Sequence, residues 1–215
     1  MKKSPYKLIE VKPRIFFLDF KNQYDCNMTF LRYQEYYESP NPKFRGKPFD
    51  LLAFMEWYSQ KYGKGAFTYG VDWAGFNIPG QVIKDIWDNG ILDRNIYDYE
   101  MKFVYDRCRQ QYPDGKFYVI GAVGQEFAMR HEIAHGFFYT QPKYKKEMTK
   151  LVKALKPKFR SAIYKELKRI GYASKVYVDE CQAYLATGFT ENFAITLKGE
   201  NTPFVKLYNE YYDVK

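Results

Sequence analysis

Two histidines and a glutamate form the most distinctive chemical pattern in this sequence. They are His131, Glu132 and His135, in the order His-Glu-Ile-Ala-His. In an α-helix, residues four positions apart lie on the same face about one turn apart, so both imidazole rings can reach a single metal ion. Glu132 directly follows His131, where its carboxylate can contact a water molecule bound to that ion without being a ligand itself.

The scarcity of histidine makes this spacing informative, because the chain has only these two. Two histidines placed at random would stand four residues apart, with Glu after the first, on the order of one time in a thousand or less. The spacing therefore favours a zinc-binding pair, in the HExxH arrangement of zinc hydrolases. The structural alternative is a helix that carries two partly buried, hydrogen-bonded histidines and a glutamate that faces solvent.

The residues before this pattern add a family resemblance. Lys116–Ile120 has the pattern of a strand, glycines follow at 121 and 124, and a helix is expected from about 125 to 138. In this order the segment resembles the zincin metallopeptidases, and the resemblance covers about residues 116–190. It implies a zincin-like core with a mixed sheet, one Zn²⁺ ion per chain, and a peptide substrate that pairs in extended form with a strand of that sheet.

A catalytic zinc site requires a third protein ligand and one open position. The chain has no third histidine, and neither Cys26 nor Cys108 lies in the Gly-Cys-Leu type of sequence found in peptide deformylases. A carboxylate from a later helix remains, as in the gluzincin group. Glu180 is the preferred residue, with Asp179 and Glu191 as alternatives. Asp179 is also a candidate hydrogen-bond partner for the other ring nitrogen of a histidine, with a charge on the helix surface as its alternative role.

The surroundings of Glu180 explain this preference. Small and polar residues, Ala183, Tyr184 and Thr187, share its helical face. The interval from His135 to Glu180 is 180 − 135 = 45 residues, which is wide for a gluzincin, and Tyr184 stands where many gluzincins have an aspartate. A Glu followed by Ala and an aromatic residue is also similar to the HExxH proteins that cleave repressors in bacteria and phages.

The resemblance also implies roles in peptide hydrolysis. Zinc would lower the pKa of its bound water toward 7, and Glu132 would act as general base. A second hydrogen-bond donor to the oxyanion is expected from Tyr172, Tyr177 or Tyr184. Since the chain has 22 tyrosines, each of these three has packing as its alternative role.

The predicted elements give an α+β fold. Residues 8–20 are strand-rich, and helices are expected over 50–62, 81–88, 96–111, 142–155, 157–171 and 175–187. No element is assigned over 22–49, where residues 39–42 mark a loop; 64–80 is expected to be irregular, and 190–215 to form a strand and an aromatic segment. We expect a single domain, 1–215, made of an aromatic-rich N-terminal region of no recognised family (1–95), a zincin-like catalytic core with a helical insertion (96–190) and a C-terminal tail that packs on it (191–215).

The net charge of +9 points to a possible anionic partner. Residues 142–170 contain 11 Lys and Arg against 2 Glu, so that 11 − 2 = +9 and the rest of the chain nets to zero. This segment predicts either a solvated helix face or a basic flank that attracts an acidic peptide or protein substrate. The runner-up function, a non-catalytic anion- or nucleic-acid-binding protein with a structural metal or histidine pair, depends on this charge alone.

The three cysteines are widely spaced and form no CxxC pair, which indicates a reducing compartment. Charges interrupt the apolar residues near the N-terminus, and no window approaches 18 apolar residues, so neither a signal peptide nor a membrane span is expected. A cytoplasmic location follows as the expectation.

Overall fold

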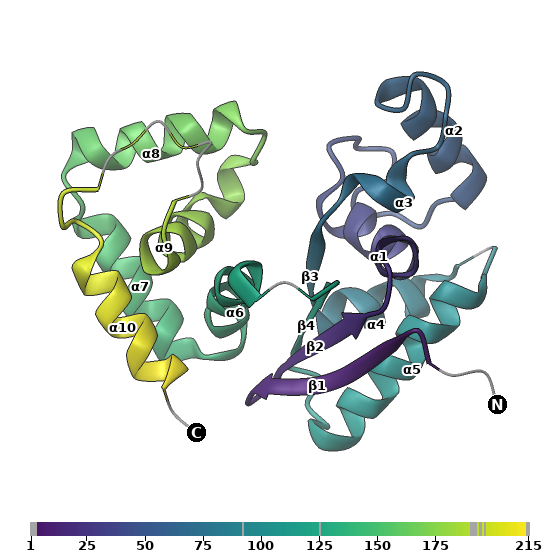
Figure 1. Ribbon diagram of the computed structural model, residues 1–215, viewed down its shortest axis with the longest axis horizontal. Helices are drawn as coiled ribbons and strands as arrows, with labels where there is room; N and C mark the ends of the chain where they lie inside the picture. Colours follow the sequence, from purple (N-terminus) through teal and green to yellow (C-terminus); the bar gives the residue numbers. More distant parts are fainter. Residues whose placement is uncertain are drawn as a thin grey trace. The chain divides into compact units, whose positions relative to one another are not determined.

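The computed structural model describes residues 4–91, 93–124, 126–189, 193, 195 and 197–213 (Figure 1). The chain divides into two units, Met1–Gln125 and Glu126–Lys215. The first unit holds a four-stranded sheet and helices, whereas the described part of the second is helical. The fold is therefore mixed α+β, as the sequence predicts.

The sheet of the first unit has the order β1-β2-β4-β3. Strands β1 (Tyr6–Lys12) and β2 (Ile15–Phe20) form an antiparallel pair in which Leu8 faces Leu18. β2 runs parallel to β4 (Tyr118–Ala122), and β4 runs antiparallel to β3 (Gly75–Pro79). β4 is thus an interior strand, and β1 and β3 are the two edges.

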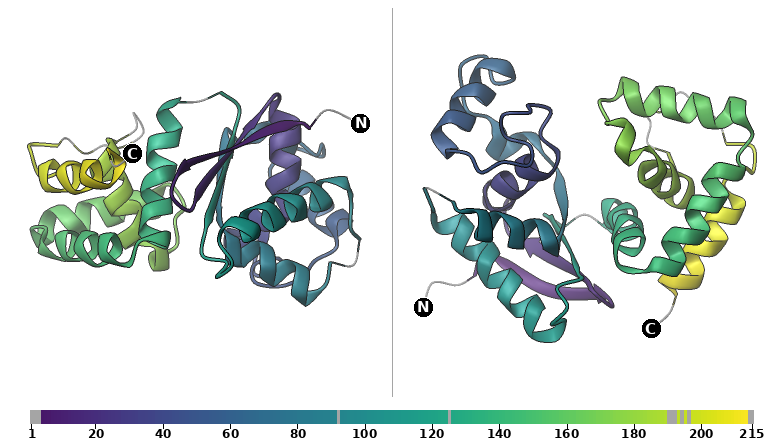
Figure 2. Two further views of the ribbon diagram at one scale, coloured as in Figure 1. Left: turned by 90° about the horizontal axis from the view of Figure 1, so that it is seen from below. Right: turned by 180° about the vertical axis from the view of Figure 1, so that it is seen from behind.

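Five helices accompany this sheet: α1 (Gln23–Glu38), α2 (Leu51–Lys61), α3 (Tyr69–Asp72), α4 (Gly80–Asn89) and α5 (Ile96–Gln111). α1 packs against β2, β3 and β4, and α5 packs against α1 and α4 (Figure 2). The core between them is aromatic: Phe30 of α1 is fully buried and stacks on Phe76 of β3, with ring centroids 5.3 Å apart. These packed rings account for part of the chain's high aromatic content.

The sequence did not predict α1. Asn22 caps the helix by accepting a hydrogen bond from the Asp25 backbone N–H at 2.8 Å. The buried face of α1 includes Arg32, whose guanidinium pairs with Asp98 at 3.0 Å. Because polar side chains occupy part of the inward face, the helical spacing of apolar residues is broken, and the periodicity gives no clear signal.

The second unit is built from α6 (Glu126–Thr140), α7 (Pro142–Ala154), α8 (Pro157–Arg169), a 3₁₀ turn (Ser174–Val176), α9 (Tyr177–Thr187) and α10 (Thr202–Tyr212). α9 packs against α6, α7, α8 and α10. Its residues from Glu180 to Ala186 are all buried, so α9 is the central helix of this unit. The strand expected in the tail falls mostly on residues outside the described part, and the aromatic segment after it is α10.

The division between the units differs from the segmentation expected from the sequence. Residues 96–122 were expected in the catalytic core with the histidine helix. Instead, α5 packs on α1 and α4, and β4 lies between β2 and β3, so both belong to the first unit. The boundary falls between Gln125 and Glu126, at the start of α6, because the interior position of β4 ties it to strands from the N-terminal region.

Among the described residues, no helix combines the length and the apolar character that a bilayer crossing requires.

Candidate metal centre

Helix α6 places the two histidines on one face, as their spacing predicts. The Nε2 atoms of His131 and His135 lie 3.2 Å apart. His135 is buried, with 4% of its surface exposed, whereas His131 is partly exposed. The rest of the helix is fixed by apolar contacts, since Ile133, Ala134 and Phe137 are buried.

The third member of the group comes from α9. Glu180 Oε2 lies 3.9 Å from His131 Nε2 and 3.7 Å from His135 Nε2. The three side chains offer one ligand atom each, all within 4.8 Å of one another. The structure thus brings together the two histidines and the carboxylate that the sequence analysis preferred.

These spacings fit a zinc ion. Ligand atoms about 2.0–2.1 Å from a tetrahedral zinc lie about 3.3–3.4 Å from one another. The two nitrogens are already at 3.2 Å, and the carboxylate oxygen requires only a small approach from 3.7 and 3.9 Å. Two imidazoles and one carboxylate are also a donor set that zinc hydrolases use, and they leave a fourth position open.

The other ring nitrogens are held by outer partners. His135 Nδ1 lies 2.9 Å from Asp179 Oδ1, and His131 Nδ1 lies 3.2 Å from Thr187 Oγ1. The Thr187 hydroxyl donates to the Ala183 carbonyl at 2.8 Å, so its oxygen is the acceptor for His131. Both rings therefore donate from Nδ1, which leaves both Nε2 atoms on the side of Glu180.

This arrangement separates the three acidic candidates. Glu180 faces the Nε2 atoms, whereas Asp179 holds the Nδ1 side of His135. Asp179 is thus placed as a hydrogen-bond partner of His135, a role for which the sequence made it a candidate. Glu191, the other alternative, lies outside the described residues.

The electrostatics of the two rings are unequal. Burial and the neighbouring His135 lower the pKa of His131 to about 3. For His135, burial lowers the pKa, but Asp179 and Glu180 more than offset this, and its pKa is raised well above the usual value. A proton therefore resides on His135, where two carboxylates stabilise positive charge, and a divalent cation would take its place.

Glu132 lies beside this group on α6 and is partly exposed. Its charge contributes to raising the pKa of His135 and of Tyr172 and Tyr184. It is therefore within electrostatic reach of both histidine and tyrosine groups, without being a member of the three-residue ligand set.

The structure brings two of the three candidate tyrosines to this site. The ring of Tyr184 lies 4.5 Å from that of His131, and the Tyr172 and Tyr184 hydroxyls share a hydrogen bond. Burial, then the charge of Glu180, raises the pKa of Tyr172, so this hydroxyl stays a proton donor. Tyr177 instead packs against Tyr164 of α8, with ring centroids 5.1 Å apart.

Two further residues of the network went unrecognised in the sequence. Gln182 is fully buried and donates to Asp179 Oδ1 at 3.0 Å, and Tyr144 donates to Gln182 Oε1 at 2.9 Å. Gln182 follows Glu180 by two positions, which places it on a different helical face, and Tyr144 is one of many tyrosines. No spacing rule therefore connects them with the histidines.

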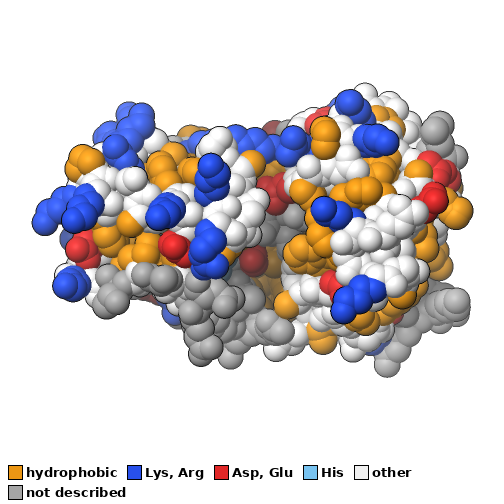
Figure 3. All heavy atoms as spheres, turned by 90° about the horizontal axis from the view of Figure 1, so that it is seen from above, with side chains coloured by type: hydrophobic (Ala, Val, Ile, Leu, Met, Phe, Trp, Pro, Cys, Tyr) orange, Lys and Arg blue, Asp and Glu red, His pale blue; other side chains and the backbone are white. Residues whose placement is uncertain are grey.

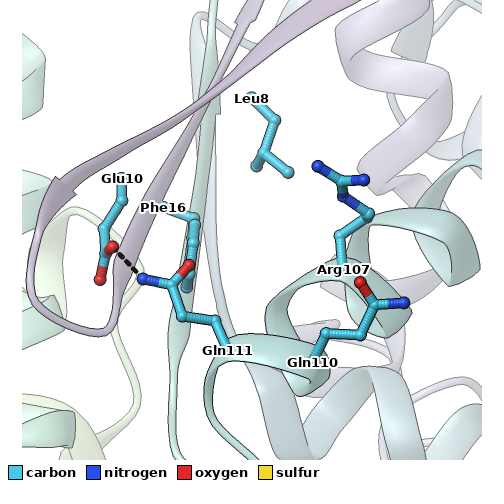
Figure 4. A pocket seen from close by; sticks show the side chains of 6 residues that line it. All are labelled: Leu8, Glu10, Phe16, Arg107, Gln110 and Gln111. Atoms are coloured by element: carbon cyan, nitrogen blue, oxygen red, sulfur yellow. Dashed lines mark hydrogen bonds between the residues drawn. The ribbon is translucent and has the colours of Figure 1, made fainter.

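A separate cavity lies in the first unit, between strands β1 and β2 and helix α5. Its volume is about 440 Å³ (Figure 4). The Gln111 amide donates to the Glu10 carboxylate at its edge. The cavity is lined by Leu8, Glu10, Phe16, Arg107, Gln110 and Gln111. This lining contains neither histidine nor cysteine.

Fold and site together describe a mixed α+β protein with a candidate metal centre in its helical unit. No family model matches the sequence, and no curated protein or solved structure matches it.

Proposed function

We propose that this protein is a zinc-dependent hydrolase that cleaves peptide bonds. The observation that carries the proposal is the convergence of His131 Nε2, His135 Nε2 and Glu180 Oε2 within 4.8 Å, with Glu132 next to the first ligand. The outward Nδ1 hydrogen bonds support it, because they orient both rings as neutral ligands. A zincin-like arrangement of the catalytic core is part of the same proposal.

The chain's own residues would then divide the work of hydrolysis. Zinc held by His131, His135 and Glu180 would supply an activated water and polarise the scissile carbonyl. Glu132 would accept a proton from the water and deliver it to the leaving amine as the C–N bond breaks. Tyr172 donates to the Tyr184 oxygen, and the Tyr184 hydroxyl, which stays protonated, would donate to the oxygen that becomes negative.

Metal analysis and one conservative variant test this proposal. Purified protein is expected to hold about one zinc per chain, and His131→Ala to lose it, because two ligands are left. Glu132→Gln keeps the shape and the metal but removes the base, so cleavage of a peptide library is expected to fall by about 100-fold or more.

Two results would contradict the proposal. If wild-type protein prepared with zinc available holds no stoichiometric metal, the proposed metal centre is wrong. If Glu132→Gln cleaves as fast as wild type, Glu132 is not the general base.

A second candidate function, binding of an anion or a nucleic acid, is favoured by the surface of α7 and α8. Several of their apolar residues, such as Met148 and Leu167, are buried, whereas many of their lysines and arginines are exposed (Figure 3). The two acidic residues of the segment pair locally, Glu147 with Lys150 at 3.0 Å and Glu166 with Arg169 at 2.8 Å. An acidic peptide as substrate of the metal centre accounts for the same surface, and we retain it as the primary proposal.

We also infer a reducing compartment, in line with the expected cytoplasmic location. The three cysteines, Cys26, Cys108 and Cys181, are free and buried. Burial raises the pKa of each thiol to about 12, so all three stay in the unreactive thiol form.

A further inference from the structure

A chain of hydrogen bonds, buried at Tyr144 and Gln182 and partly exposed at Asp179, connects helix α7 with the candidate metal centre. The Tyr144 hydroxyl donates to Gln182 Oε1 at 2.9 Å. The Gln182 amide donates to Asp179 Oδ1 at 3.0 Å, and the same oxygen accepts the hydrogen bond of His135 Nδ1 at 2.9 Å. Three hydrogen bonds, through the side chains of Gln182 and Asp179, thus connect the phenol of Tyr144 with a proposed zinc ligand.

The chain has a single consistent direction. Gln182 Nε2 has two hydrogens, which go to Asp179 Oδ1 and to the Ala134 carbonyl at 3.4 Å. Its carbonyl oxygen is then left to accept from Tyr144. Tyr144 and Gln182 are both fully buried, so water does not replace either partner.

Packing alone accounts for the ring of Tyr144 but not for its hydroxyl. The ring contacts Phe137 and Tyr211, with centroids 5.6 and 5.0 Å apart, and a phenylalanine would make the same contacts. What the hydroxyl adds is the bond to Gln182. Tyr144 and Gln182 are fully buried, so each is costly to bury unless its polar atoms are hydrogen-bonded.

We propose that Tyr144 and Gln182 are positioning residues of the metal centre. They hold Asp179 in place, and Asp179 in turn fixes the ring plane of His135 so that Nε2 points at the ion. The inference rests on the proposed function. It extends that function by making α7, part of the basic segment between His135 and Glu180, a support of the metal site.

The consequence is measurable as metal affinity. In Tyr144→Phe, Gln182 loses the hydrogen bond that Tyr144 donates to its Oε1, and its amide is free to rotate away from Asp179. Loss of such outer partners lowers metal affinity by about 10- to 100-fold. We expect about a 10-fold loss for Tyr144→Phe, and a larger loss for Gln182→Met, which removes the whole link.

The experiment uses the full chain and titrates zinc in competition with a chromophoric chelator. The visible absorption of the cobalt(II)-loaded protein is a second readout, since it reports ligand geometry. Tyr211→Phe is the matched control, because that ring packs on Tyr144 but its hydroxyl is not part of the chain of bonds. Thermal unfolding of each metal-free variant shows whether the fold is retained.

The expected result is weaker zinc binding and a changed cobalt spectrum in Tyr144→Phe and Gln182→Met, with Tyr211→Phe like wild type. Wild-type affinity in Tyr144→Phe and Gln182→Met would overturn the inference and leave the metal centre standing. An equal loss in Tyr211→Phe would also overturn it, because the effect would then be one of packing. A wild-type chain that binds no zinc would instead refute the proposed function, and the inference with it.

Discussion

At the scale of single residues, the two imidazoles are held by different kinds of partner. His135 donates to a carboxylate, that of Asp179, whereas His131 donates to the hydroxyl of Thr187. An anionic acceptor makes the ring a more basic ligand than a neutral acceptor does. His135 is therefore expected to be the stronger of the two nitrogen ligands.

A second residue-scale feature is a buried carboxyl in the first unit. Glu35 of α1 is 6% exposed, and burial, partly offset by the nearby hydroxyls of Ser39 and Tyr69, raises its pKa from 4.5 to about 7. The carboxyl is protonated in both folded and unfolded states below pH 4.5. Between pH 4.5 and 7 only the folded state keeps the proton, so stability is lost as the pH rises, by at most about 3 kcal/mol.

Replacement of Glu35 by glutamine tests this expectation. The variant cannot ionise, so its stability relative to wild type should increase from pH 5 to pH 8. Urea unfolding followed by tryptophan fluorescence measures it, because Trp57, Trp73 and Trp87 all lie in the first unit. If the stability difference between Glu35→Gln and wild type is the same at pH 5 and pH 8, the pKa of Glu35 is not raised.

The candidate site shows what residue spacing can predict. His131, Glu132 and His135 are adjacent on one helix, so local geometry is enough to place them together. Glu180 was chosen because later carboxylates are few and it has small neighbours. The position of Asp179, one residue earlier, depends on how α9 is rotated against α6, and the direction of Tyr177 depends on its packing with α8. Such rotations are set by tertiary packing and are not encoded in a local pattern.

At the scale of elements, the close approach of α1 to β4 depends on a glycine. A Cβ atom at Gly121 would lie 2.2 Å from Cε2 of Phe30, well inside van der Waals contact. Phe30 is fully buried and stacks on Phe76, so its ring has little room to move. The strand and the helix can pack at this distance only because the side chain at 121 is missing.

Gly121→Ala is therefore expected to destabilise the first unit by about 1–3 kcal/mol, as overpacking does in other cores. The shift of the urea midpoint in tryptophan fluorescence measures the change. In the double variant with Phe30→Leu, the smaller side chain relieves the clash. The double variant should therefore lose less unfolding free energy than the sum of the losses in the two single variants. If the losses of the two single variants are strictly additive in the double variant, the side chain at 121 does not clash with Phe30.

The helices with clear caps and apolar spacing were predictable. The expected ranges 50–62, 96–111 and 142–155 correspond to α2, α5 and α7 within a few residues. β3 was missed because its strand pattern is short, contains glycine and proline, and is completed only by pairing with β4. The short strand gains its stability from a partner that lies far away in the sequence.

At the scale of the whole molecule, charge is distributed unevenly. The basic segment 142–170 carries the entire net charge of the chain, 11 − 2 = +9. It lies on α7 and α8, in the same unit as the metal centre. Such a concentration attracts anions over a distance of about one Debye length, roughly 10 Å at 0.1 M salt.

An acidic peptide should therefore be cleaved more slowly at high salt. We expect kcat/KM for an acidic peptide to fall several-fold between 50 and 200 mM salt, about as expected for steered association, and that for a neutral peptide to change little. Lys165→Glu with Lys168→Glu should reduce the salt effect. Lys43→Glu with Lys47→Glu, exposed lysines of the first unit, is the matched control.

Rates that do not respond to salt would refute this attraction. Salt-sensitive binding of duplex DNA that is lost in the same Lys165 and Lys168 variant, with no effect on cleavage, would favour the second candidate function instead.

The wide interval between His135 and Glu180 gives the proposed ion a mechanical role. The interval of 180 − 135 = 45 positions spans the end of α6, all of α7 and α8, the 3₁₀ turn and the start of α9. An ion bound by both ends would act as a cross-link that closes this loop, and it would reduce the entropy of the unfolded chain much as a disulfide does. The same three side chains would then both form the reaction centre and cross-link the helical unit through the ion.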